Sequence, residues 1–184
     1  MTAAVERDGA AQQALLSGDV PAARVAFAEA AALYRQSWIE APPSAYGRLV
    51  GMLKSAVLAG GGADSEARYA RDALADADPE SATAAYARAL AALILGEDGD
   101  AQAWAGRMPS GGEAFGRTAE AIAALAARDG AGYETALAAI VGDFEARTEH
   151  LTGVAIADTA LVLATLAARR GIETTLASPV LPAL

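Results

Sequence analysis

Alanine supplies more than a quarter of this 184-residue chain, and no other feature of the sequence restricts its fold so strongly. Alanine is the best intrinsic helix former, and its burial costs no side-chain rotamer entropy, so an alanine-rich chain favours closely packed helices. The β-branched and aromatic residues that strands prefer are sparse, with aromatic residues at 5%. The composition therefore predicts an all-α protein.

Apolar residues recur at helical spacing from one end of the chain to the other. Within each stripe they lie mostly three or four residues apart, which places them on one face of a helix. The stripes are Val25, Phe27, Ala30, Ala31 and Tyr34; Tyr46, Val50, Leu53 and Val57; Tyr86, Leu90, Leu93 and Ile94; and Tyr133, Leu137, Ile140, Val141 and Phe144. No segment alternates with a period of two for long enough to predict a strand.

Short turn-forming segments separate these stripes at regular intervals. In residues 18–21, Asp19 is suited to cap a helix and Pro21 to occupy its first turn. Similar breaks follow at residues 41–44, 60–64, 78–81, 96–100, 108–113, 129–130 and 152–153. We expect about nine helices, and the short loops require consecutive helices to pack antiparallel. The pattern predicts a single domain, residues 1–184, of stacked helical hairpins.

One segment resembles a known repeat. Residues 18–30, Gly-Asp-Val-Pro-Ala-Ala-Arg-Val-Ala-Phe-Ala-Glu-Ala, are similar to the second half of a tetratricopeptide repeat. In this resemblance Ala23 matches the small residue at which the two helices of the repeat touch, and Phe27 matches the aromatic residue one turn on. Residues 73–79 look like the repeat ending, one residue longer than usual, and residues 129–133 keep a turn and an aromatic. The resemblance covers about one repeat closely and implies a tetratricopeptide-like right-handed superhelix, or a compact array, that binds another polypeptide.

A second resemblance covers the C-terminal quarter. Residues 133–137, residues 149–161 and the ending Arg169-Arg170-Gly171-Ile172 are similar in cadence to some all-helical bacterial immunity proteins of polymorphic toxin systems. In those families a penultimate helix leads through a loop into an alanine- and leucine-rich last helix that stops at Arg-Gly. The resemblance implies a protein that binds and blocks a cognate toxin.

The last predicted helix, over residues 154–170, is apolar almost all round. Asp158, Thr165 and Arg169 share one face at spacings of seven and four residues, which gives the helix a narrow polar edge. We expect it to cap the array. The alternative is a homodimer face, since a terminal repeat without a polar outer surface tends to pair.

The charge balance narrows the class of partner. With 23 acidic and 14 basic residues the net charge is −9, and no cluster of Lys and Arg predicts nucleic-acid binding. An acidic rim would instead steer a basic polypeptide.

The N-terminus lacks the pattern of a signal peptide, and residues 154–168 are too short to span a bilayer, so we expect a cytoplasmic protein. Scarce Lys and Asn suggest a high-GC bacterial genome.

Recognisable catalytic, cofactor and metal motifs are missing from the sequence. His150 is the only histidine and the chain has no cysteine, which excludes paired-His and Cys metal sites. A lone His near a helix end more often bonds carbonyl groups there. Lys54 lies among apolar residues without a serine or phosphate-loop motif. We predict no enzyme activity, and a convergence of carboxylates with His150 in one cleft would reopen that question.

Aromatic residues are the candidate contacts for a partner. Tyr, Trp and Arg dominate interface hot spots, and we single out Trp38, Tyr46, Tyr69 and Trp104.

The leading hypothesis is a non-enzymatic helical-repeat module that binds another polypeptide, with an immunity protein as its specific alternative. A small-molecule-binding helical protein is the remaining alternative, and a deep pocket lined by apolar groups would favour it.

Overall fold

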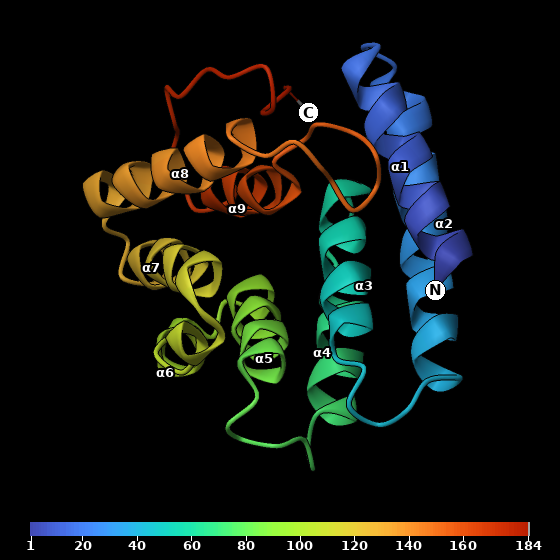
Figure 1. Ribbon diagram of the computed structural model, residues 1–184. Coiled ribbons are helices and arrows are strands. Elements are labelled where there is room, and N and C mark those ends of the chain that lie inside the picture. Colours follow the sequence, from blue (N-terminus) through green and yellow to red (C-terminus); the bar gives the residue numbers. More distant parts are fainter. Residues whose placement is uncertain (184) are drawn as a thin grey trace.

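The computed structural model describes residues 1–183, and these form nine α-helices and one short 3-10 helix without a β-strand (Figure 1). The prediction of an all-α chain with about nine helices is confirmed. None of the helices in residues 1–183 is at once long and apolar enough to cross a membrane. The helices are α1 (Thr2–Leu16), α2 (Val20–Ile39), α3 (Gly47–Leu58), α4 (Asp64–Ala73), α5 (Ala82–Leu95), α6 (Asp98–Ala105), η1 (Met108–Gly111), α7 (Glu113–Ala126), α8 (Gly130–Glu145) and α9 (Asp158–Ala168).

Side-chain caps fix the starts of several helices. The Oδ1 atom of Asp19 accepts a hydrogen bond from the Ala22 amide at 3.0 Å, and Pro21 stands in the first turn of α2 as predicted. Asp129 caps α8 in the same way, through the Gly132 amide at 3.0 Å. The cap and the first-turn proline predicted for α2 are therefore confirmed, and the break predicted at residues 129–130 is the start of α8.

Each helix from α1 to α8 packs on the next, and α5 also contacts α3 and α7. Alanines at these contacts are almost fully buried, as at Ala23, Ala67 and Ala70, and their small side chains let helix axes approach closely. Larger side chains such as Phe27 and Leu90 fill the remaining core. The result is a curved array of hairpins (Figure 1).

The helix expected over residues 154–170 is α9, which begins only at Asp158. The residues before it leave the helix because the Ala157 amide donates to the Val180 carbonyl at 2.7 Å, in the C-terminal segment. Helix α9 contacts α3, α7 and α8, and its side chains Leu161, Leu163 and Leu166 are buried. It therefore lies inside the array and joins α3 to α7 and α8, and the expected cap at one end of the array is corrected accordingly.

Polar side chains at the end of α9 form hydrogen bonds and an ion pair with other parts of the chain. Arg169 donates to the Gly61 carbonyl at 2.7 Å and to the Gly62 carbonyl at 3.2 Å. Arg170, which is almost buried, pairs with Asp98 at 3.1 Å. These contacts fasten the end of α9 to the loop before α4 and to the start of α6. The homodimer face considered for this helix stays a prediction.

The loop between α8 and α9, residues 146–157, crosses α1 at a point where only glycine fits. A Cβ atom on Gly9 would lie 2.9 Å from the carbonyl oxygen of Thr152. The Thr152 hydroxyl also donates to the Gln12 side chain on α1, at 2.6 Å. The loop is therefore held directly against α1 (Figure 1).

Replacing Gly9 with Ala is expected to lower the free energy of unfolding by about 1–3 kcal/mol, because the added methyl group must push the Thr152 backbone away. Gly142→Ala is the matched control, since a Cβ at Gly142 in α8 meets nothing within 4 Å. That substitution should stabilise the protein by about 0.5–1 kcal/mol through helix propensity. Urea unfolding of both variants measures these changes in the free energy of unfolding. Equal changes in the two variants would contradict the close packing of the loop on α1.

Candidate functional site

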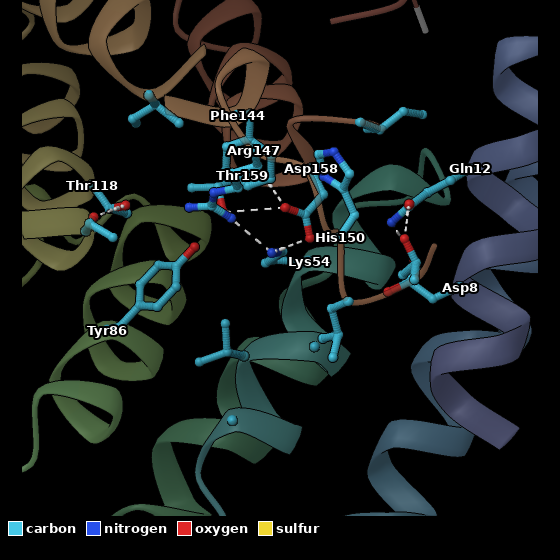
Figure 2. Close-up of a pocket in the computed structure, with 18 of the residues that line it drawn as sticks. Asp8, Gln12, Lys54, Tyr86, Thr118, Phe144, Arg147, His150, Asp158 and Thr159 are labelled. Carbon is cyan, nitrogen blue, oxygen red and sulfur yellow. Dashed lines mark hydrogen bonds and ion pairs between the residues drawn. The ribbon is translucent and has the colours of Figure 1, made fainter. Parts of the chain in front are cut away.

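A cavity of about 330 Å³ lies where α1, α2 and α3 face α5, α7, α8 and the loop 146–157 (Figure 2). Its size falls at the lower end of the range of small-molecule sites, about 300–1,000 Å³. Much of the wall is apolar, and it includes Val50, Phe115, Ile140, Phe144, Val154 and Ile156. Between these side chains, three sets of polar and charged groups face the cavity.

The first set is a largely buried ion pair between Lys54 of α3 and Asp158 at the start of α9. Lys54 also donates to the Thr159 hydroxyl at 3.3 Å. Burial alone would lower the pKa of Lys54, but the Asp158 carboxylate and the other groups around it outweigh burial and raise the pKa. Lys54 therefore stays an ammonium ion at neutral pH.

The second set, here called the Asp8 network, joins α1, α2 and the loop 146–157. The Tyr34 hydroxyl donates to Oδ2 of Asp8 at 3.2 Å, and the Gln12 amide donates to Oδ1 at 3.4 Å. Thr152 in turn donates to Gln12 at 2.6 Å. Burial, followed by the charge of Asp158, raises the pKa of Asp8 to about 6 despite the opposing effect of Lys54.

The third set, the arginine cluster, lies on α7 and α8. Arg117 pairs with Asp143 at 2.6 Å, and Arg147 pairs with the same carboxylate at 2.5 Å. Arg117 also lies 3.6 Å from Glu113, whose side chain is almost fully exposed. Two guanidinium groups thus share one partly buried carboxylate, and the exposed Glu113 offsets the second positive charge at this end of the cavity.

His150 and Tyr86 complete the polar lining. The His150 ring stacks on Phe144 with ring centroids 6.2 Å apart, and its Nδ1 atom is buried without a hydrogen-bond partner among residues 1–183. The sequence had suggested instead that this side chain would bond carbonyl groups at a helix end. Burial raises the pKa of Tyr86 although Lys54 opposes the shift, so its phenol is neutral at pH 7.

The four aromatic residues selected from the sequence lie outside this cavity. Trp38 and Tyr46 pack together near the turn between α2 and α3, with ring centroids 6.1 Å apart. Tyr69 lies under the Arg35 guanidinium, and the Trp104 ring contacts the guanidinium groups of both Arg88 and Arg107. All four side chains are half-buried. The structure brings together only the first two.

The cavity does bring together the groups that would reopen the question of an enzyme. Asp8, Asp143, Asp158 and His150 all line it. Asp8 can exchange a proton near pH 6, whereas Asp143 and Asp158 are held in ion pairs. Among residues 1–183, no three His, Cys, Asp or Glu side chains are placed to hold a metal ion. The prediction that the protein is not an enzyme stays a prediction.

Sequence reasoning did not select Asp8, Lys54 or Asp158 as site residues, although Lys54 and Asp158 each carried a signal in the sequence. Lys54 is the chain's only lysine and interrupts an apolar stripe, and Asp158 interrupts the most apolar run. Asp8 is 7% exposed in a helix whose other buried residues are mostly small or apolar. A charge on a buried helix face requires a partner, and this requirement is the signal that could have identified the site.

Comparison of the chain with protein-family models, with curated proteins and with solved structures found no match. The resemblances to tetratricopeptide repeats and to immunity proteins therefore stay predictions.

Replacing Lys54 with Met is expected to lower the free energy of unfolding by about 2–4 kcal/mol, because it leaves the Asp158 carboxylate buried without its partner. The double variant Lys54→Met/Asp158→Leu should recover most of this loss, since it removes both charges. Urea unfolding at pH 7.5 checks both. Additive losses in the double variant would show that the two charges do not interact.

Replacing Asp8 with Asn should change how stability depends on pH. Because the pKa of Asp8 rises to about 6 from its ordinary value of 3.8, the folded protein binds a proton more readily than the unfolded chain does. The wild type therefore loses about 3 kcal/mol of stability as the pH rises from 4 through 6. Asp8→Asn should be more stable than the wild type at pH 7.5 by up to this amount, and about equal to it at pH 4.

The matched control for this comparison is Asp72→Asn, which makes the same chemical change at an exposed position on α4. The difference in free energy of unfolding between Asp72→Asn and the wild type should be the same at pH 4 and at pH 7.5. Thermal or urea unfolding at pH 4 and pH 7.5 provides the measurement, and a constant difference for Asp8→Asn as well would exclude a raised pKa for Asp8.

Proposed function

We propose that this protein binds a small amphipathic molecule in the cavity between α1–α3 and α5–α9. The observation that carries the proposal is the lining itself, in which apolar walls surround a few buried and fixed polar groups. Small-molecule sites have this composition, because apolar surface supplies most of the affinity and convergent polar groups set orientation. A pocket with apolar walls is the feature that we expect of a small-molecule-binding helical protein, and this cavity supports that alternative.

The polar groups support binding because they are pre-organised. Asp8 is held by Tyr34 and Gln12, and Asp158 is held by Lys54 and by the Thr159 amide at 2.7 Å. Groups that are already fixed lose little conformational entropy when a ligand arrives, so more of the interaction free energy appears as affinity. The site therefore needs no rearrangement of these side chains to accept a ligand.

Binding of another polypeptide is our second proposal, and one surface patch supports it. The paired rings of Trp38 and Tyr46 are half-buried, and the neighbouring Ile39 is 62% exposed. Aromatic residues of this kind dominate interface hot spots. We rank it second because the cavity brings several fixed polar and charged groups together around one apolar space.

The test of the first proposal uses the neutral fluorescent probe N-phenyl-1-naphthylamine. The wild type should bind it saturably with enhanced fluorescence. Val50→Trp should weaken this binding at least about tenfold, because Val50 lines the cavity and the indole ring would occupy it. Val25→Trp is the matched control, since Val25 is 59% exposed on α2 and lies outside the cavity.

Circular dichroism establishes that both variants remain folded. Equal probe affinity in the two tryptophan variants would place binding elsewhere on the surface and overturn the proposal. Absence of saturable binding to the wild type would overturn it as well.

A further inference from the structure

We propose that the cavity selects a small primary amine, whose ammonium group binds Asp8 while its apolar body lies against the cavity walls. The inference rests on the function proposed above and adds the chemistry of the ligand's polar end.

Asp8 is the one carboxylate of the cavity that has no basic side chain in ion-pair contact within residues 1–183. Its two hydrogen bonds come from the neutral groups of Tyr34 and Gln12. An ionised carboxylate accepts about four hydrogen bonds, so about half of its capacity remains unused. Burial of a charge without a counter-charge is costly, and a cationic ligand would remove that cost.

The charges around Asp8 favour one additional cation. Asp8, Asp158 and Lys54 together carry two negative charges and one positive charge when Asp8 is ionised, and both neighbours act on the pKa of Asp8. An ammonium ion beside Asp8 would balance this group of charges. The arginine cluster on α7 and α8 already has its own carboxylate, Asp143, so it does not serve Asp8.

An ammonium group also fits the geometry better than a metal ion does. Oxygen-preferring metal ions take six or more oxygen ligands, and Asp8 offers one carboxylate among neutral side chains. A primary ammonium has three donors and needs only a carboxylate, one or two further acceptors and an apolar environment for the rest of the molecule. The Tyr34 hydroxyl beside Asp8 supplies an acceptor, and its ring lies in the same cavity lining.

The experiment measures displacement of N-phenyl-1-naphthylamine at pH 7.5 by two compounds of the same shape, 2-phenylethylamine and 2-phenylethanol. In the wild type, the amine should displace the probe at a concentration at least about tenfold lower than the alcohol, because a desolvated charge-assisted pair contributes at least this factor. Asp8→Asn should reduce the preference to about twofold or less. Asp72→Asn, on the exposed face of α4, should keep the wild-type preference.

A third competitor, 3-phenylpropanoate, tests the opposite charge. Stronger displacement by this anion than by the amine would assign the ligand's polar end to the arginine cluster and overturn the inference. Equal displacement by amine and alcohol, or an amine preference that survives Asp8→Asn, would overturn it too. In each of these cases the probe still binds, so the proposed small-molecule function stands. Only a failure of the probe to bind the wild type removes both.

The same competition at pH 5.0 tests the inference without altering Asp8. The groups that face Asp8 are Gln12 of α1, Tyr34 of α2, Lys54 of α3 and Asp158 of α9. Protonation of Asp8 should reduce the amine preference several-fold relative to pH 7.5. Because His150 also lines the cavity, the measurement is repeated with His150→Gln, which should lose the preference in the same way. A preference that does not change with pH in both proteins contradicts a role for Asp8.

Discussion

The ion pair between Lys54 and Asp158 sets where α9 lies within the array of hairpins. It joins α3 to the first turn of α9, and these elements are distant in sequence. Apolar contacts are non-directional and do not by themselves specify which helices α9 must face, whereas a buried charge is stable only opposite its partner. Asp158 also lies at a helix N-terminus, where a negative charge is favourable. The pair therefore fixes the position of α9 inside the curve of hairpins, and it forms part of the cavity lining.

Two aspartates in this cavity have opposite electrostatic environments. Asp158 has Lys54 beside it, whereas Asp8 has only neutral hydrogen-bond partners and a raised pKa. The first arrangement supports the fold, and the second opposes it at neutral pH. A buried group that lowers stability is a common feature of functional sites, because binding or catalysis requires it in that form. This contrast is the physical basis for assigning ligand recognition to Asp8.

The helices could be predicted from the sequence, whereas the site could not, and the difference has one physical reason. Helix formation depends on neighbours three or four residues apart, so alanine content, apolar periodicity, the cap at Asp19 and the regular breaks were sufficient. The cavity depends on contacts between helices far apart in the chain. Lys54 and Asp158 were each visible as a charge in an apolar stretch, but nothing local shows that they face each other. The aromatic residues were chosen by type alone, and Tyr69 and Trp104 stack against arginines away from the cavity.

The Asp8 network also couples the cavity to the loop 146–157. Thr152 in this loop bonds to Gln12, and Gln12 bonds to Asp8, so the loop position and the carboxylate orientation depend on each other. The close approach of Gly9 to Thr152 holds the two segments together at the same place. A ligand that engages Asp8 would therefore stabilise the contact between α1 and the loop as well as fill the cavity. By thermodynamic linkage, the free energy by which such a ligand stabilises the contact equals the binding free energy that is lost when the contact is broken. This holds even without a change in any lining residue.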